Sequence, residues 1–412
     1  MAVKKKSESF QRLSEIMGRG YMELHERAQK GAFVVWIAII VPVELFHGFE
    51  NVVCAVPESH AATSAAKGVG VIQAEKAERL GYSMDLCSYA RIDMGSAFDN
   101  GRDSPTFGLP RPQMMISNNN NCSLLVKWFD VYRRKWNIPH FVLDVPFCYE
   151  EQKARDLQYI LDQFGELISA VEKLSGQRFD PAGVEKALSY TYEGVSYWKR
   201  FLEFARHRPS GITVFDSFVQ MAPVLTLRGT PQFAEHYRLL YEETCDNVEH
   251  GEFPVPGERV RLLWDNIAPW HQLRKMSQRL AEQSVNIVAA PYTWCFGSKE
   301  GDFALYPYEG DFLAYMARMQ NNTVCPHGLS LRKKAMEKAI PWFGADGVVF
   351  ASNRSCKVFS VMQQDLMRHV IEKMNVPAVM IDVDHADARK YSEEEAFVRL
   401  SALRETIEAR WN

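Results

Sequence analysis

The sequence lacks the short motifs that carry several common kinds of chemistry. It has no Gly-x-x-x-x-Gly-Lys-(Ser/Thr) loop for ATP, no His-Glu-x-x-His motif for zinc and no Cys-x-x-Cys pair. The glycines of "KGVGVIQ" (67–73) do not directly follow a strand-like run, and the pattern ends at Gln73 rather than at glycine. These absences argue against ATP hydrolysis, dinucleotide binding, a zinc ribbon and a thioredoxin-type redox site on this chain.

Long apolar runs and an excess of one charge are also missing. The most apolar stretch, "AFVVWIAIIVPVELF" (32–46), is shorter than the roughly 18–20 residues that cross a bilayer, and it contains Pro42 and Glu44. The lysines near Met1 are followed by no apolar segment with a small-residue cleavage site, so we expect a soluble cytoplasmic protein. A net charge of −3 gives no basic field for nucleic acid.

Length and hydrophobic patterning predict two α/β lobes. The chain has 412 residues, which is long for one domain. Near-continuous apolar runs alternate with amphipathic helical patterns, which favours mostly parallel sheets flanked by helices. We expect an N-terminal helical segment, a first α/β lobe, a helix-rich connecting region and a second α/β lobe, at 1–30, 31–150, 151–250 and 251–412.

Two segments of the chain are near repeats of each other, at 116–145 and 350–383. Each runs from an apolar strand to Asn-x-x-Cys, then through a helical pattern to a second apolar run ending in Asp-Val. The cysteines, Cys122 and Cys356, therefore follow strand ends and precede helices, where backbone N–H groups favour a thiolate. Ligands of parallel sheets bind at such strand ends, so we expect both cysteines at one cleft between the lobes.

Cys87, in "YSMDLCSYAR" (82–91), is a third thiol among polar neighbours. Three thiolates from three loops could hold an iron–sulfur cluster and leave one iron open. From the residues alone, ordinary buried cysteines are the favoured interpretation.

Three other groups of residues have both a chemical and a structural interpretation. Glu58 and His60 could be an acid–base pair or residues of a helix start. The acids of "DVDHADAR" (382–389), with His385, could bind a hard metal ion or form a solvated turn. Trp264 and Trp270 could line an apolar pocket or belong to the core.

Seven segments together resemble the 2-hydroxyacyl-CoA dehydratase and benzoyl-CoA reductase superfamily over about residues 20–410. They are "VPESHAA", "GYSMDLCSYARIDMG", "NNNNCSLLVKWFD", "FDSFVQMAP", "WDNIAPW", "NRSCK" and "DVDHADAR". The resemblance implies two similar lobes with one [4Fe–4S] cluster between them, held by Cys87, Cys122 and Cys356. It also implies a related second subunit, an acyl-CoA substrate and a separate ATP-hydrolysing iron–sulfur activator. Asn119 and Asn353, each a few residues before a cysteine, are candidates for hydrogen bonds to the cluster.

One departure from the dehydratase pattern bears on the substrate. The dehydratases typically read Trp-Ser-x-Ser in the first strand, where this chain reads Trp-Ile-Ala-Ile (36–39). A pocket for a 2-hydroxyl needs polar partners, whereas an aromatic ring needs an apolar wall. We therefore expect a subunit of an ATP-driven aryl-CoA (benzoyl-CoA-type) reductase that forms a dienoyl-CoA.

In this interpretation four residues contact the substrate: Trp36, Ile37, Ile39 and Trp270. Glu58 and His60 are the candidate proton donors. The alternatives are an (R)-2-hydroxyacyl-CoA dehydratase subunit and a non-catalytic subunit that only holds a cluster.

Overall fold

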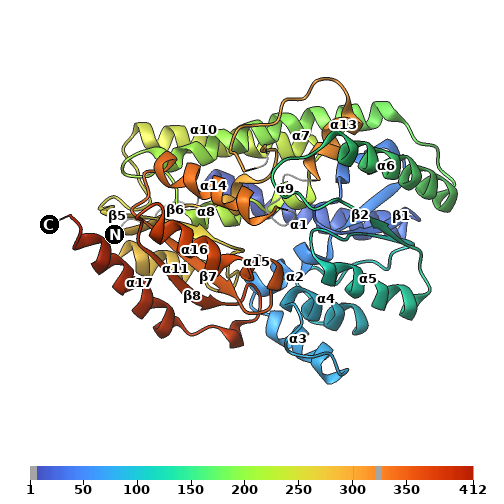
Figure 1. Ribbon diagram of the computed structural model, residues 1–412. Helices are drawn as coiled ribbons and strands as arrows, with labels where there is room; N and C mark the ends of the chain where they lie inside the picture. The colour runs from blue at the N-terminus through green and yellow to red at the C-terminus, as the bar shows by residue number, and fades with distance from the viewer. Residues whose placement is uncertain (1–6, 300, 321–326, 412) are drawn as a thin grey trace.

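Two four-stranded sheets form the frame of the molecule (Figure 1). The computed structural model describes residues 7–299, 301–320 and 327–411. The first sheet has the order β2-β1-β3-β4 and the second β6-β5-β7-β8, and all of these neighbours are parallel. The strands are β1 (Phe33–Ile37), β2 (Val52–Ala55), β3 (Met114–Asn118), β4 (His140–Leu143), β5 (Val260–Asp265), β6 (Val285–Ala289), β7 (Gly347–Asn353) and β8 (Ala378–Val383). The predicted α/β class is confirmed, and the two sheets share one strand order.

Helices flank both sheets (Figure 1). With the first sheet go α1 (Glu8–Gln29), η1 (Val43–Gly48), α2 (Pro57–Ala66), α3 (Gly70–Arg79), α4 (Ser88–Phe98) and α5 (Ser123–Trp136). With the second go α11 (Leu273–Ala281), α12 (Pro291–Trp294), α14 (Leu329–Trp342), α15 (Lys357–Ser360), α16 (Gln363–Glu372), η3 (Ala388–Lys390) and α17 (Glu393–Glu408). The helix α13 (Phe312–Met319) lies between these in the chain but places Tyr315 and Met316 in the core of the first sheet. Within the described ranges, no helix combines the length and the apolar character that a bilayer crossing needs.

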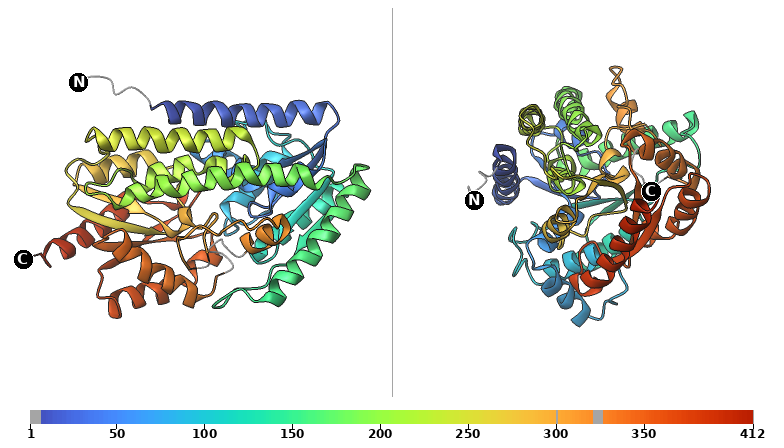
Figure 2. Two further views of the ribbon diagram at one scale, coloured as in Figure 1. Left: turned by 90° about the horizontal axis from the view of Figure 1, so that it is seen from above. Right: turned by 90° about the vertical axis from the view of Figure 1, so that its left-hand side faces the viewer.

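Helices from the middle of the chain join the two halves. They are α6 (Ala154–Ser175), α7 (Pro181–Leu202), η2 (Glu203–Arg206), α8 (Val214–Gln220), α9 (Ala222–Thr226) and α10 (Pro231–Glu249). The long helices α7 and α10 pack side by side along the length of the molecule (Figure 2). One end of α7 places Val184 and Leu188 in the core of the first sheet, and the other places Val195 and Trp198 in the core of the second. A single helix therefore holds the two lobes in a fixed relation.

The two repeated segments occupy equivalent places in the two sheets. Each contributes the third and fourth strands, β3 with β4 and β7 with β8. Asn118 at the end of β3 is in register with Leu143, and Asn353 at the end of β7 is in register with Val383. The chain leaves both strands at the same point and reaches a cysteine before the next helix. Because the strands are parallel, both cysteine loops emerge at the carboxyl ends of their sheets.

Candidate active site between the two lobes

A cavity between the lobes brings together all three predicted cysteines. Cys87 and Cys122 line it from the first lobe, and Cys356 lines it from the second. Its apolar wall consists of Ile39, Ile40, Leu124, Leu125, Trp128, Ile267, Tyr292, Phe296, Val358 and Phe359. Its other lining residues are Glu58, Tyr89, Asn121, Cys295 and His385. The arrangement is a mostly apolar pocket with a few convergent polar groups, as expected of a small-molecule site.

Each of the three cysteines directly precedes a helix. Cys87 caps α4, Cys122 caps α5 and Cys356 caps α15. Burial raises the pKa of each thiol, and it raises that of Cys356 to about 12. Backbone N–H groups in the turn after each cysteine lower the pKa of all three thiols, but by less than burial raises it. Without a metal these thiols are therefore protonated, and they would become thiolates on binding one, because a metal ligates the deprotonated form.

The donor set fits an iron–sulfur cluster better than a single ion. In the described part of the chain, no three His, Cys, Asp or Glu side chains lie close enough to hold one ion. A cluster is wider than an ion, and its usual ligands are cysteine thiolates that reach it from several sides. Three thiols at the wall of one cavity, each followed by a helix start, meet that requirement.

Glu58 also faces this cavity. It lies in the first turn of α2 and is only 5% exposed. Its Oε1 accepts a hydrogen bond from the backbone N–H of Ile39 at 3.0 Å, and its Oε2 has no partner among the described residues. Burial raises the pKa of Glu58 to about 7. The carboxyl group can therefore both release and accept a proton near neutral pH.

His60 lies two residues further along α2 but does not line the cavity. Its Nδ1 lies 2.8 Å from Asp93 Oδ1, and its Nε2 lies 2.9 Å from Ser104 Oγ. Asp93 also accepts a hydrogen bond from Tyr132 at 2.6 Å. The predicted pair is thus divided between two environments, and Glu58 is the member that borders the cavity.

The predicted substrate-contact residues are divided in the same way. Ile39 lines the cavity, whereas Ile37 is buried within β1. Trp36 packs against Tyr132 and Trp136 in the core, and its Nε1 donates to the Pro110 carbonyl at 2.9 Å. Trp270 stands behind the cavity wall, where its Nε1 donates to the Tyr89 hydroxyl. The contrast between serine and isoleucine therefore bears on the cavity at position 39 and not at position 37.

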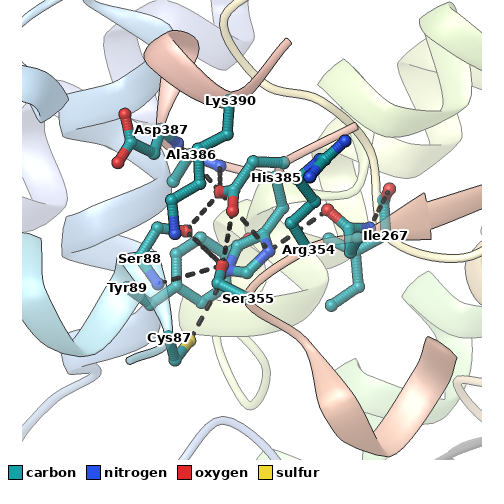
Figure 3. A network of polar contacts seen from close by, with 12 residues as sticks. Cys87, Ser88, Tyr89, Ile267, Arg354, Ser355, His385, Ala386, Asp387 and Lys390 are labelled. Carbon is teal, nitrogen blue, oxygen red and sulfur yellow. Dashed lines mark hydrogen bonds and ion pairs between the residues drawn. The ribbon is translucent and has the colours of Figure 1, made fainter. Parts of the chain in front are cut away.

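The two predicted asparagines also differ in their contacts. The Asn119 side chain joins strand ends of its own lobe, because it donates to Asp144 and accepts from the Val145 N–H. Asn353 donates to the Ile267 carbonyl, and its Oδ1 lies 3.3 Å from His385 Nδ1. His385 Nε2 lies 3.6 Å from Cys87 Sγ (Figure 3). Asn353 therefore reaches a cysteine through one intervening ring.

Sequence reasoning missed several lining residues, among them Tyr89, Trp128 and Tyr292, and it named His385 only for a candidate metal site. Trp128 had a usable signal, since it lies on α5 six residues after Cys122. Tyr89 follows Cys87 by two residues and could have been found in the same way. Tyr292 and His385 come from segments whose path depends on tertiary packing, so spacing along the chain gave no signal that they line the cavity.

Comparison with known proteins identifies the family. The family model described as 2-hydroxyglutaryl-CoA dehydratase, D-component, matches residues 38–407. The (R)-phenyllactyl-CoA dehydratase alpha subunit of Clostridium sporogenes is 30% identical over 97% of this chain and 95% of its own length. The (R)-2-hydroxyisocaproyl-CoA dehydratase alpha subunit of Clostridioides difficile is 30% identical over 97% of this chain and 96% of its own. A benzoyl-CoA reductase chain of Thauera aromatica is 26% identical over 81% of this chain and 79% of its own length. The similarity is thus higher to these dehydratase chains than to this reductase chain, and the protein belongs to the 2-hydroxyglutaryl-CoA dehydratase D-component family.

Proposed function

We propose that this chain is the catalytic subunit of an (R)-2-hydroxyacyl-CoA dehydratase with a [4Fe–4S] cluster on Cys87, Cys122 and Cys356. The observation that carries the proposal is the shared cavity: the three thiols and the unpartnered carboxyl oxygen of Glu58 border the same space. Similarity to dehydratase alpha subunits over 97% of the chain supports the choice of reaction. This choice replaces the reductase as the leading interpretation, because the chain is more similar to the dehydratase chains than to the reductase chain, and because only Ile39 of the two isoleucines lines the cavity.

In the proposed reaction, the 2-hydroxyl and a hydrogen from the neighbouring carbon leave as water, and an enoyl-CoA remains. When bound, the cluster supplies the single electron that makes such a hydroxyl a feasible leaving group. Glu58, with a pKa of about 7, gives a proton to the departing hydroxyl and later recovers one from the substrate. The apolar wall excludes water from this exchange. Proton and electron are both returned, so the overall reaction is a dehydration without net redox change.

The cavity favours an uncharged, apolar acyl group. None of its lining residues within the described ranges is lysine or arginine, and residues 300 and 321–326 contain neither type. Arg228, which lines the adjoining cavity, is already paired with Glu44 at 2.8 Å. A free carboxylate on the acyl chain would therefore be buried without a cation, which is costly in binding free energy. The acyl groups in the names of the two dehydratases above, phenyllactyl and 2-hydroxyisocaproyl, carry no carboxylate and therefore fit such a cavity better than 2-hydroxyglutaryl does.

An aryl-CoA reductase is the second candidate, and Ile39 is the observation that favours it. Ile39 presents a branched apolar side chain at the cavity wall, where a hydroxyl is expected in a dehydratase. In such an enzyme Glu58 would protonate the ring rather than a leaving hydroxyl. Tyr89, Asn121 and His385 nevertheless bring polar groups to the same cavity, so a 2-hydroxyl has other potential partners there.

The proposal includes two protein partners. The alpha-subunit names of the relatives support a second, related subunit. The family resemblance also implies an activator that hydrolyses ATP and donates the electron. We place ATP binding on that activator and not on this chain.

The test is an anaerobic reconstitution with the related second subunit and the activator. We expect a brown protein with about four iron atoms on this chain. We also expect conversion of phenyllactyl-CoA to the enoyl-CoA, with far slower turnover of 2-hydroxyglutaryl-CoA. Consumption of benzoyl-CoA without dehydration of any 2-hydroxyacyl-CoA would establish the reductase instead. A chain that binds no iron would overturn both.

A further inference from the structure

Three residues of the acidic motif at 382–389 form a buried network, whereas Asp382 stays partly exposed and pairs with Arg354. Asp384, His385 and Asp387 are all fully buried. Asp384 lies just after β8, and its two carboxylate oxygens accept hydrogen bonds from two different serines. Ser88 Oγ donates to Oδ1 at 2.7 Å, and Ser355 Oγ donates to Oδ2 at 2.6 Å (Figure 3). The function of this network is not explained by substrate binding, because Asp384 does not line the cavity.

The two serines lie next to two of the cysteines and belong to different lobes. Ser88 follows Cys87 in the first lobe, and Ser355 precedes Cys356 in the second. The serines also contact each other, since the Ser88 backbone N–H donates to Ser355 Oγ at 3.2 Å. One carboxylate therefore joins both cysteine loops across the boundary between the lobes.

The orientation of Asp384 is fixed by its own turn. Its Oδ1 also accepts the backbone N–H groups of Ala386 and Asp387, at 3.1 and 3.0 Å. Asp387 in turn pairs with the buried Arg91 of α4 at 2.9 Å. The turn is thus held against the helix that Cys87 caps, and the carboxylate has little freedom to follow either serine if one loop moves.

We propose that Asp384 is a positioning residue for the cluster, which fixes the separation of Cys87 and Cys356 before the cluster is bound. Charge-assisted hydrogen bonds to a carboxylate are stronger than neutral ones, and here two of them act on residues adjacent to ligands. The inference rests on the cluster named in the proposed function and not on the choice of substrate. It assigns a role to a residue that contacts neither substrate nor thiol.

A matched variant separates positioning from general stability. Glu258 is a second buried carboxylate, which accepts from the Ser210 N–H at 3.2 Å and from Asn286 Nδ2 at 2.8 Å, and pairs with Arg261. It lies before β5, at the end of the second sheet opposite to the cysteine loops. Asp384→Asn and Glu258→Gln therefore remove comparable charges at opposite ends of one lobe.

The experiment measures three properties of each full-length variant. These are the melting temperature of the iron-free protein, the rate of iron uptake from ferrous iron and sulfide without oxygen, and the electron paramagnetic resonance spectrum of the reduced product. We expect both variants to melt at lower temperature. Only Asp384→Asn should take up iron several-fold more slowly and give an altered spectrum, because only this change releases the cysteine loops.

Two milder variants keep the test decisive if Asp384→Asn does not fold. Ser88→Ala and Ser355→Ala each remove one side of the link, and the pair should be non-additive in iron uptake, because both act through one carboxylate. Wild-type uptake and spectra in the Asp384 variant, or in the serine double variant, would overturn the inference alone. No iron uptake by the wild-type chain would overturn the proposed function as well.

Discussion

Glu58 Oε1 accepts a hydrogen bond at 3.0 Å from the backbone N–H of Ile39, the second residue after β1. This contact joins the first turn of α2 to the end of the central strand β1 and fixes the carboxyl group in the cavity wall. It uses one carboxyl oxygen and leaves the other without a partner among the described residues. Because the donor is a backbone group, the contact does not depend on whether position 39 carries serine or isoleucine. The acid can therefore keep its place while the pocket beside it changes.

Replacing Glu58 by glutamine should remove proton exchange and leave the cluster in place. Glutamine can still accept the Ile39 N–H but cannot donate or accept a proton. General acid–base catalysis contributes about 10²–10⁴-fold, so we expect kcat to fall by about that factor with unchanged iron content. Turnover assays and iron determination on the same preparation check this. His60→Gln is the control, because His60 lies outside the cavity lining. Its replacement should lower Tm and leave kcat nearly unchanged.

The raised pKa of Glu58 also predicts how stability depends on pH. The pKa moves from an ordinary 4.5 to about 7 on folding, mainly because burial disfavours the charged form. Between these values the folded chain holds a proton that the unfolded chain has lost, so stability falls as pH rises. Above pH 7 the accumulated cost is about 3 kcal/mol. Glu58→Gln should therefore raise Tm of the iron-free protein at pH 8 but have little effect near pH 4. An equal shift at both pH values would contradict the raised pKa.

Position 39 should control substrate choice, and position 37 should not. Ile39→Ser places a hydroxyl at the cavity wall, so we expect the ratio of kcat/KM for small 2-hydroxyacyl-CoA over bulky apolar substrates to rise. Ile37→Ser buries a hydroxyl inside β1 instead, and a buried hydroxyl without a partner costs about 1–3 kcal/mol. It should lower Tm and leave that ratio unchanged. Equal effects of the two changes on the ratio would show that the cavity wall does not set the preference.

The fold and the shared cleft of Cys122 and Cys356 could be predicted because both leave local patterns, whereas the place of Cys87 beside them was implied by the family resemblance. Buried parallel strands are short apolar runs, and the near repeat at 116–145 and 350–383 marks equivalent strand pairs in the two sheets. The cysteines share a local context as well, since each directly precedes a helix.

The remaining parts of the site depend on tertiary packing. Trp36 and Ile37 precede Ile39 in one apolar run, yet only Ile39 reaches the cavity, because the strand has ended by that residue. Asp384 looks like an exposed acid in the sequence. It is buried because Ser88, almost 300 residues away, supplies one of its hydrogen bonds. A link between lobes has no local signature, so composition and spacing could not reveal it.

The cysteines should differ in their effect on iron binding, and the difference tests the ligand set. Cys87, Cys122 and Cys356 each cap a helix at the cavity, whereas Cys295 lines the same cavity but donates its thiol to the Tyr292 carbonyl at 2.9 Å. We therefore expect alanine at any of the first three positions to reduce iron per chain to less than half, and Cys295→Ala to retain it. The iron-free variants should keep a Tm near that of the iron-free wild type, because removing one sulfur atom from a buried site costs little stability. Iron determination after anaerobic reconstitution, with melting curves of the same samples, checks both statements. Loss of iron in Cys295→Ala alone would contradict the proposed ligand set and assign Cys295 to the cluster instead.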